Sequence, residues 1–440
     1  MIARSLLLVW VPMVTACAGN VAEVSHLNAQ VSDAVQTVVV VEWETDVPVR
    51  GWVEFGLDGE MDSLSVKSVE PETSHRALLM GLPENREVSY RVVVANETDE
   101  QVGEVYLVET GALPGELPRL EVSGASAGAY MAVPVLGTTT AATILSPQGD
   151  ITWYHTDESG LDVYRVRLAQ DGQSVLYNAG SVSGDPSDAS MLVRVSLDGA
   201  VVDTIPVPLL AHDFVEHPDG TLAALVVEYR EVDGVEVRGD QVVEVDPEGN
   251  QSVVWSAWDC FSPESHPGEI TGWTFANALD FDPSDQAYTV GFRNQSSIVR
   301  VDRETGGCLW ALGGSMGTLE LDEGSSPFLH QHQFVLKEDR LLVFDNEGSA
   351  GVESRVVEYE LDLERSTARE VWSYVATPPV FSFVLGDVDR LGGGDALVTW
   401  SVAGQIERVN PSGERVWQLN SELGHAFGFN TVFDGFHSSR

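Results

Sequence analysis

Two histidines, an asparagine and an arginine are the residues of this sequence best suited to chemistry. His332 follows Gln331 at the start of an apolar stretch, and His212 begins a similar stretch. Near neutral pH, imidazole serves as a nucleophile, a base or a metal ligand. The guanidinium of Arg293 can hold a tetrahedral anion with a fixed fork of donors, and Asn277 can donate to developing negative charge. Together these residue types suit transfer of an anionic group through a histidine intermediate.

The spacing of these residues predicts that they meet. In five places a residue precedes a turn position by seven residues. The pairs are Tyr164 and Asp171, His212 and Asp219, Ala278 (beside Asn277) and Asp285, His332 and Asp339, and Asp387 and Gly394. The innermost strands of a β-propeller run along its central channel, so equivalent positions at their starts converge on one end of it. We therefore expect the first members of these pairs, with Asn277 or Ala278, to approach one another.

A second repeat predicts the fold that positions this ring. From about residue 118, short strands alternate with glycine-containing turns, and the strand after the turn often ends near a tryptophan. The turn glycines Gly149, Gly199 and Gly249 lie 50 residues apart, and later units are slightly longer. Six such hairpins fit six four-stranded blades. Residues 118–440 are therefore predicted to form an all-β, six-bladed β-propeller, with five or seven blades as the alternatives.

Residues 31–113 are predicted to form a separate small β-domain. Several strands alternate there, and Leu82-Pro83 precedes a strand that contains Tyr90. This order resembles a fibronectin type III β-sandwich, in which such a tyrosine closes a corner between the sheets. Nothing in this domain suggests catalysis, so we interpret it as a spacer or interaction module. Residues 111–115 are the expected linker to the propeller.

The first residues predict export. Residues 1–17 combine a short positive start, an apolar run too short to span a membrane and a small-residue segment that ends at Cys17. This resembles a lipoprotein signal, in which the cysteine becomes lipid-modified; the alternative is an ordinary signal peptide cut near Ala16 or Ala18. Residues 18–30 are then a tether. We expect a periplasmic or cell-surface protein attached to the outer membrane by its lipid anchor.

Charge and cysteine usage narrow the function further. The formal net charge is −44, and only two lysines are present. Such a surface repels nucleic acid and anionic headgroups, so we expect no nucleic-acid partner and no membrane contact beyond the anchor. Besides Cys17, the chain has Cys260 and Cys308. An exported chain with two further cysteines invites a disulfide, and two buried free thiols are the alternative.

Several motifs of the propeller resemble those of bacterial arylsulfate sulfotransferases. The resemblance covers roughly residues 120–435, and its most specific parts are Phe292-Arg293-Asn294-Gln295-Ser296 and Gln331-His332 with Phe344-Asp345-Asn346. His212-Asp213-Phe214 and Asn277-Ala278-Leu279-Asp280 also match. The resemblance implies a periplasmic six-bladed propeller that moves sulfuryl groups from aryl sulfates to phenols without the nucleotide donor PAPS. No cofactor is implied.

The resemblance also implies roles for the site residues. His332 would be the nucleophile that becomes sulfated, and Asn277 would orient the sulfuryl group. Arg293 and His212 would bind the sulfuryl oxygens and stabilise the leaving phenolate. One departure is Phe275, which stands where the family usually has a histidine, so a donor is removed. The substrate-binding candidates are Tyr164, Phe275 and His330.

Two other readings of the site remain. The first is a non-catalytic propeller that binds a ligand or protein partner at the same mouth, which Phe275 favours. The second is a metal site of three histidines. His330 and His332 would share one face of a strand because side chains alternate, and His212 would be the third ligand. We rank the metal site lower, since no carboxylate or cysteine has a matching spacing. His217, in a Pro-Asp-Gly turn, is predicted to be exposed.

Overall fold

The computed structural model describes residues 21–180, 187–263, 272–348 and 353–436. Its chain divides into two compact units. The first contains residues 21–29, 41–77 and 88–108, and the second, the propeller unit, contains segments 30–40 and 78–87 with everything from residue 109 onward. The predicted signal peptide and Cys17 lie outside the described residues. No helix in the described part of the chain is long and apolar enough to cross a membrane.

The N-terminal part of the chain is all-β, as predicted. Its strands are β1 (Val24–Val31), β2 (Val39–Leu57), β3 (Ser63–Leu64), β4 (Glu72–Leu79), β5 (Glu87–Ala95), β6 (Glu100–Val102) and β7 (Tyr106–Glu109). The long strand β2 pairs with β1, β3, β4 and β5. Its alternating burial follows the period of two of a strand that has one face in a core, where Trp43 and Phe55 lie. The fibronectin type III assignment stays a prediction.

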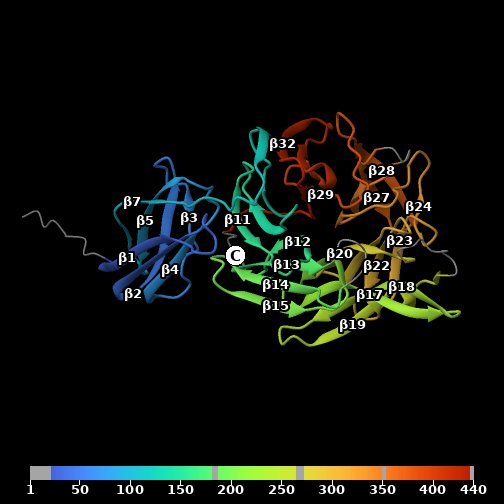
Figure 1. The fold of residues 1–440 in the computed structure, drawn as a ribbon, viewed down its shortest axis with the longest axis horizontal. Coiled ribbons are helices and arrows are strands. Elements are labelled where there is room, and N and C mark those ends of the chain that lie inside the picture. Colours follow the sequence, from blue (N-terminus) through green and yellow to red (C-terminus); the bar gives the residue numbers. More distant parts are fainter. Residues whose placement is uncertain (1–20, 181–186, 264–271, 349–352, 437–440) are drawn as a thin grey trace, which may run out of the picture. The chain divides into compact units, whose positions relative to one another are not determined.

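The described residues of the propeller unit contain six sheets that follow one another around a centre (Figure 1), which confirms the predicted six-bladed architecture. The first blade contains β9 (Tyr130–Leu136), β10 (Ala141–Leu145) and β11 (Ile151–Thr156), with β33 (Ala426–Phe427) and β34 (Thr431–Phe433) paired to β9. The second contains β12 (Asp162–Leu168), β13 (Ser174–Gly180), β14 (Met191–Ser196) and β15 (Val202–Pro206). The third contains β16 (Leu210–Glu216), β17 (Leu222–Val232), β18 (Val235–Val245) and β19 (Gln251–Ser256).

The other three blades repeat this pattern. The fourth contains β20 (Ala276–Asp282), β21 (Ala287–Phe292), β22 (Ser297–Asp302) and β23 (Cys308–Leu312). The fifth contains β25 (Phe334–Lys337), β26 (Arg340–Asp345), β27 (Arg355–Asp362) and β28 (Thr367–Tyr374), with β24 (Glu320–Leu321) parallel to β28. The sixth contains β29 (Asp387–Arg390), β30 (Ala396–Trp400), β31 (Gln405–Val409) and β32 (Arg415–Ser421), with β8 (Leu120–Gly124) at its outer edge.

Strands from the two ends of the propeller sequence close the circle. β8, at the start, pairs with β32 of the sixth blade, with Gly124 opposite Trp417. β33 and β34, at the end, pair with β9 of the first blade. Segments from one end of the propeller sequence thus pair with a blade from the other end, which stabilises the closed propeller against opening.

The glycine repeat marks the hairpin between the third and outermost strand of a blade. Gly149, Gly199 and Gly249 have φ values of 98°, 72° and 87°. Only glycine adopts these values without strain, so the spacing in the sequence reports the period of the blades. The apolar faces on either side of these hairpins form the cores between blades, in which Trp153, Trp255 and Trp417 are buried.

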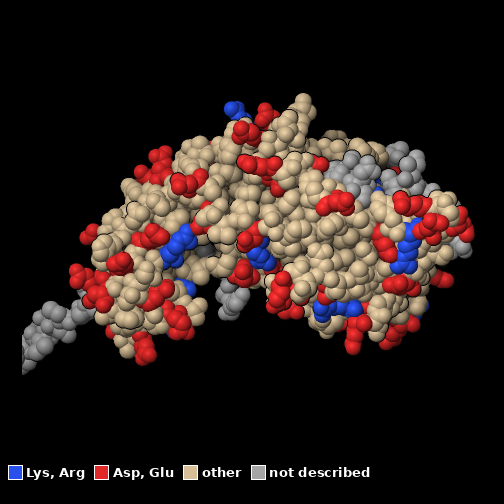
Figure 2. All heavy atoms as spheres, turned by 60° about the horizontal axis from the view of Figure 1, so that its bottom comes forward, with Lys and Arg blue, Asp and Glu red and all other residues tan. Residues whose placement is uncertain are grey.

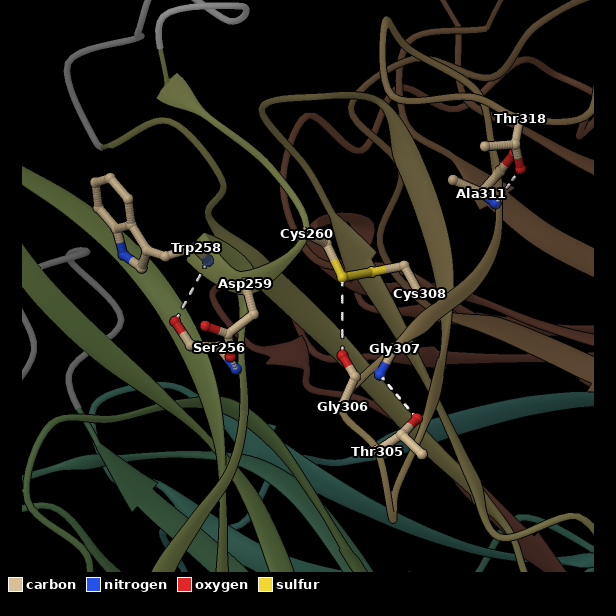
Figure 3. Close-up of a disulfide and its surroundings, with 10 residues drawn as sticks. All are labelled: Ser256, Trp258, Asp259, Cys260, Thr305, Gly306, Gly307, Cys308, Ala311 and Thr318. Carbon is tan, nitrogen blue, oxygen red and sulfur yellow. Dashed lines mark hydrogen bonds between the residues drawn. A yellow bond between two sulfur atoms is a disulfide. The ribbon is translucent and has the colours of Figure 1, made fainter.

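Cys260 and Cys308 are joined by a disulfide in the structure. Figure 3 shows Cys260 after the short 3-10 segment η1 (Ala257–Asp259) and Cys308 at the start of β23. The bond therefore links the end of the third blade to the fourth. Closing a loop of 48 residues stabilises the folded state by about 4 kcal/mol through the entropy of the unfolded chain.

Acidic side chains are scattered over the face in Figure 2, with basic ones in small groups between them. No large basic area breaks up this face.

Candidate active site at the centre of the propeller

Breaks in the register of the innermost strands turn the predicted residues toward the centre. The pairing of β12 with β13 breaks between Val163 and Val166, around Tyr164. Breaks between Leu210 and Phe214 and between Ala276 and Ala278 enclose His212 and Asn277. Such β-bulges re-aim a side chain out of the regular alternation. His332 lies two residues before β25, where its N–H donates to the Phe344 carbonyl at 3.1 Å.

The structure brings four predicted residues together, which we call the ring: Tyr164, His212, Asn277 and His332. The Tyr164 and His212 rings have centres 5.4 Å apart. The amide nitrogen of Asn277 donates to the carbonyl of Gln331, beside His332, at 2.8 Å. His212 is also close enough to His332 to influence its protonation. The fifth residue, Asp387, instead bonds to Arg165 at 3.0 Å, deeper in the channel.

The hydrogen bonds of His332 define its tautomer. The Asn346 amide nitrogen donates to the Ser382 and Leu385 carbonyls, each at 2.7 Å, so its oxygen faces the histidine. That oxygen accepts from His332 Nδ1 at 2.7 Å. His332 Nε2 accepts the Leu385 N–H at 3.0 Å. Nδ1 therefore carries the proton, and Nε2 carries the lone pair that a nucleophile needs.

Both ring histidines are neutral near pH 7. Burial lowers the pKa of His332 to about 3, against the Asn346 hydrogen bond, and the nearby His212 and Arg293 lower it further. Burial also lowers the pKa of His212 to about 3, helped by Arg238 and Arg293 and opposed by Asp213. A buried imidazolium would lose its hydration and meet positive neighbours. The two imidazoles are thus lone-pair carriers in this environment.

Three polar atoms of the ring are buried without a hydrogen-bond partner among the described residues. They are His212 Nδ1, the Tyr164 hydroxyl and Asn277 Oδ1. His212 is neutral and its Nδ1 faces no donor or acceptor of the described residues, so this nitrogen is open to a ligand. Burial raises the pKa of Tyr164, so its hydroxyl keeps its proton and is a donor. Unpaired buried groups each cost about 1–3 kcal/mol, which favours a bound ligand that supplies partners.

The motif Phe292–Ser296 places Arg293 by tying three segments together. Arg293 N–H donates to the Phe275 carbonyl at 3.1 Å, and the Asn294 side chain donates to the Gly272 carbonyl at 2.7 Å. Ser296 Oγ accepts the N–H of His330 at 3.0 Å. The guanidinium carbon of Arg293 then lies 6.0 Å from the centre of the Phe275 ring. The motif is thus largely scaffolding for one arginine.

The motif Phe344-Asp345-Asn346 plays the same part for His332. Asp345 accepts the N–H groups of Leu329 and Gly348 at 2.9 and 3.1 Å, and it pairs with Arg355 at 2.8 Å. Burial raises the pKa of Asp345, while these donors oppose the shift. Asn346 then orients the imidazole. Asp345 fixes the loop before His332, and the next residue, Asn346, binds the histidine. This explains why the two residues are adjacent in the motif.

The structure corrects the expectation that His330 and His332 share a strand face. His330 has φ of 50°, and both histidines precede β25, so the alternation of a strand does not apply. His330 Nδ1 lies 2.8 Å from Glu347, whereas His332 bonds to Asn346 and Leu385. No cluster of metal-ligating side chains occurs among the described residues. The geometry therefore gives the metal reading no support.

Phe275 lies in the middle of the site. It has φ of 52°, and its ring meets the His212 ring edge-on at 4.9 Å between centres. It therefore fills space beside His212 but offers no hydrogen bond. Phe275 therefore lies at the ring, beside His212.

Below the ring lies a set of paired polar residues, which we call the arginine layer: Arg165, Asp213, Gln333 and Asp387. Arg165 is ion-paired with Asp213 and with Asp387, at 3.0 Å each. Gln333 donates to Asp213 at 3.1 Å and to the Asn277 carbonyl at 2.9 Å. Asp213 also accepts the N–H of Leu279 at 3.1 Å. The layer cross-links four innermost strands or their approaches and supports the ring from beneath.

Sequence reasoning missed two contributors to the site. One is Arg238 on β18, whose guanidinium carbon lies 5.1 Å from the centre of the Phe275 ring. The other is the backbone of Leu385, which binds His332 although its side chain carries no chemistry. No motif marks either residue.

Fold and site together define a six-bladed propeller with an imidazole and guanidinium centre at one end of its channel. The model of the arylsulfotransferase (ASST) family matches residues 93–425. The chain therefore belongs to the arylsulfotransferase family. A search among curated proteins finds no significant match.

Solved structures resemble the chain only distantly. A protein of unknown function from Bacteroides caccae has 14% identity and a TM-score of 0.46, and the match covers 70% of this chain and all of that one. An auxiliary nutrient-binding protein from Bacteroides ovatus has 11% identity and a TM-score of 0.40, with coverages of 90% and 87%. A catalytically inactive virginiamycin B lyase from Staphylococcus aureus has 13% identity and a TM-score of 0.39, with coverages of 69% and 87%. At these values the likenesses carry no functional argument.

Proposed function

We propose that the protein transfers a sulfuryl group from an aryl sulfate to a phenol through a sulfo-histidine at His332. The observation that carries this proposal is the Asn346–His332 hydrogen bond, which leaves the lone pair on Nε2 of a neutral imidazole. Family membership supplies the substrate class of aryl sulfates and phenols. Arg293 and His212 lie close enough to His332 to lower its pKa, Asn277 bonds to the neighbouring Gln331 carbonyl, and Tyr164 packs on His212.

In the first step, Nε2 of His332 attacks sulfur. The N–S bond forms, the S–O bond to the aryl group breaks, and the electron pair leaves with the phenolate oxygen. Arg293 offsets the negative charge of the sulfuryl oxygens, and the Tyr164 hydroxyl, which keeps its proton, donates to the departing oxygen. Asn277 orients the sulfuryl group.

In the second step, the hydroxyl of the acceptor phenol attacks sulfur and the N–S bond breaks. The phenol proton passes to His212, whose Nδ1 is buried and has no hydrogen-bond partner among the described residues. This assigns His212 the role of a base as well as a neighbour of the sulfuryl group. Its low pKa means that it holds the proton only briefly before solvent or the released phenolate takes it.

The cycle requires one local rearrangement. The lone pair of Nε2 accepts the Leu385 N–H, so this peptide must turn aside before Nε2 can reach sulfur. Leu385 has φ of 56° and is followed by Gly386 with φ of 107°. A peptide in this part of φ space is strained for leucine, which lowers the cost of moving it. Once sulfur is bound, the same N–H can donate to a sulfuryl oxygen.

The test is turnover of a chromogenic aryl sulfate by purified residues 18–440. We expect release of the chromophore that depends on an added phenol, and a loss of more than ~1000-fold in His332→Ala. His26→Ala is the matched control, because His26 is an exposed histidine of the first unit whose Nδ1 lies 3.0 Å from Glu44. Equal rates in wild type and His332→Ala would contradict the proposed nucleophile.

The second candidate function is a propeller that binds a ligand at the ring without transferring a group. Two observations favour it: Phe275 offers no hydrogen bond, and both nitrogens of His332 are already paired within the protein. A folded protein that binds aryl sulfates but releases no phenol with several donors would support this function. Phe275→His would then show whether one missing donor separates the two.

We also propose that the protein is exported and held at the outer membrane by a lipid on Cys17. The disulfide between Cys260 and Cys308 supports an oxidising compartment, where such bonds persist. Growth with a labelled fatty acid should label the wild type but not Cys17→Ala. Absence of label from both proteins would contradict the lipid anchor.

A further inference from the structure

The Phe275 ring is close to two guanidinium groups. The guanidinium carbon of Arg238 is 5.1 Å from the centre of that ring, and that of Arg293 is 6.0 Å from it. The same ring lies 4.9 Å from His212, whose Nδ1 is buried and unpaired. Arg238 therefore approaches the Phe275 side chain from the third blade, while Arg293 approaches it from the fourth.

We propose that Arg238 is a second anion-binding residue that contacts the sulfuryl oxygens and supplies the positive charge and donors that Phe275 does not. This inference rests on the proposed function and deepens it by assigning the substrate contact. A guanidinium keeps its charge and presents five N–H donors in a rigid fork, which matches the oxygens of a sulfate ester. In a chain of net charge −44, a second local cation also counters the field that repels an anionic donor.

The backbone holds Arg238 in this position. β17 and β18 pair from Leu222 and Val245 out to Val232 and Val235, which extends the hairpin well past the neighbouring strands. The Arg238 carbonyl accepts the N–H of Trp273 at 3.2 Å. A Cβ on Gly272, which has φ of 108°, would lie 2.9 Å from that carbonyl oxygen, so only glycine permits this approach. The segment that leads to Phe275 is thus bonded to the strand of Arg238.

Asp240 fixes the same segment at a second point. Its carboxylate accepts the Thr274 hydroxyl at 2.5 Å and the Ala276 N–H at 2.8 Å, on either side of Phe275. Arg238 and Asp240 are two residues apart on β18, so their side chains leave the same face of the strand. β18 therefore carries both the guanidinium of Arg238 and the carboxylate of Asp240 that fixes the backbone around Phe275.

The electrostatic effects agree with this geometry. Arg238 lowers the pKa of His212 more than Arg293 does, and it also opposes the rise in the pKa of Tyr164. Its charge is thus felt at two ring residues that carry unpaired polar atoms. An anion bound beside His212 would lie within the field of both guanidiniums.

The test compares Arg238→Gln and Arg238→Lys with Arg230→Gln. Arg230 is the matched control because it lies on the paired strand β17 of the same hairpin and over an aromatic ring, 5.2 Å from the centre of Trp258. It is ion-paired with Glu228 and 43% exposed, away from the ring. Two quantities are measured: the affinity for inorganic sulfate by calorimetry at constant ionic strength, and kcat/KM for the aryl sulfate donor.

We expect Arg238→Gln to weaken sulfate binding and to lower kcat/KM by roughly tenfold or more, the usual effect of losing a hydrogen bond to a charged group. Arg238→Lys should retain part of both, and Arg230→Gln should change neither. Each variant's melting temperature is recorded, because a purely structural arginine would change stability without changing the affinity of the folded protein for sulfate.

The outcomes separate this inference from the proposed function. If the wild type turns over the donor and Arg238→Gln matches it in both quantities, the role of Arg238 is overturned and the exchange reaction stands. If the wild type has no turnover, the exchange reaction fails, and sulfate affinity alone decides on Arg238. A wild type that binds no sulfate, or an Arg238→Gln variant that binds it equally well, overturns the inference.

Discussion

The ring and the arginine layer are adjacent groups of buried polar residues, yet they differ in how their atoms are paired. In the arginine layer, each oxygen of Asp213 and Asp387 accepts a hydrogen bond, and Arg165 bonds to both aspartates. In the ring, His212, Tyr164 and Asn277 each have a buried atom without a partner. A group of residues that only supports the fold satisfies itself, whereas a site leaves atoms for a substrate.

The first prediction breaks the arginine layer and has the largest expected effect on stability. Arg165→Met should lower the free energy of unfolding by about 3–5 kcal/mol, because Asp213 and Asp387 would lose the buried cation that they share. Chemical denaturation measures the loss. The control is Arg365→Met, whose pair with Asp362 is 81% exposed on the arginine side; it should cost less than about 0.5 kcal/mol. Similar stabilities for the two variants would refute the role given to the layer.

The second prediction uses the protonation of the ring. The folded pKa of His212 and of His332 is about 3, below the usual 6.5, so the unfolded chain binds more protons between these values. Their contribution to stability is present above pH 6.5 and is lost as the pH falls toward 3. The loss is on the order of a few kcal/mol. Denaturation curves of wild type and His212→Phe at pH 7 and 4.5 measure this. The difference between the two proteins should shift in favour of the variant at the lower pH, and a constant difference would contradict the pKa of His212.

The third prediction concerns Asp389, whose contribution to stability should change with pH in the opposite direction. Burial raises the pKa of Asp389 to about 6, against Arg165 and Arg167. The folded chain therefore binds more protons than the unfolded chain between about pH 4 and 6, so this residue's contribution to stability falls as the pH rises through that window. Asp389→Asn removes this dependence. Relative to wild type, the variant should be roughly 1–3 kcal/mol more favourable at pH 7 than at pH 4.5. An equal difference at the two pH values would show that Asp389 is already ionised at pH 4.5 and would contradict the prediction.

The fourth prediction concerns a single hydroxyl and is the smallest in energy. Tyr164→Phe removes a buried group that has no partner, so we expect the free energy of unfolding to rise by about 1 kcal/mol and the exchange rate to fall. Tyr288→Phe is the matched control: its hydroxyl donates to Glu244 at 2.6 Å and contacts His217 at 2.9 Å. The same chemical change should therefore destabilise at position 288. A change in the free energy of unfolding with the same sign in both variants would contradict the distinction between paired and unpaired groups.

The repeats in the sequence were sufficient to predict six blades and the four residues of the ring. The hairpin before the outermost strand contains a positive φ, which a glycine supplies in every blade except the fifth, where Ser366 has φ of 56°. The ring residues keep a constant distance to the next turn because the innermost strands are equivalent. These are local requirements that recur along the chain, so their period is visible in the letters alone.

Contacts between blades were not predictable in the same way. His217 was predicted to be exposed in its turn, yet it is 2% exposed, stacks on Phe281 with ring centres 3.8 Å apart and contacts the Tyr288 hydroxyl. The neighbouring fourth blade supplies both partners. Arg238 was missed for a related reason, because its position depends on where the third-blade hairpin meets the segment before β20. Such contacts depend on three-dimensional placement, which no spacing encodes.

The most direct test of the account is mass spectrometry of the protein after brief exposure to an aryl sulfate without any acceptor phenol. The account predicts one sulfuryl group on the peptide that contains His332, its loss when a phenol is added, and no adduct in His332→Ala. A sulfuryl group found instead on a peptide that contains His212, or phenol-dependent turnover with no protein adduct at all, would contradict transfer through His332.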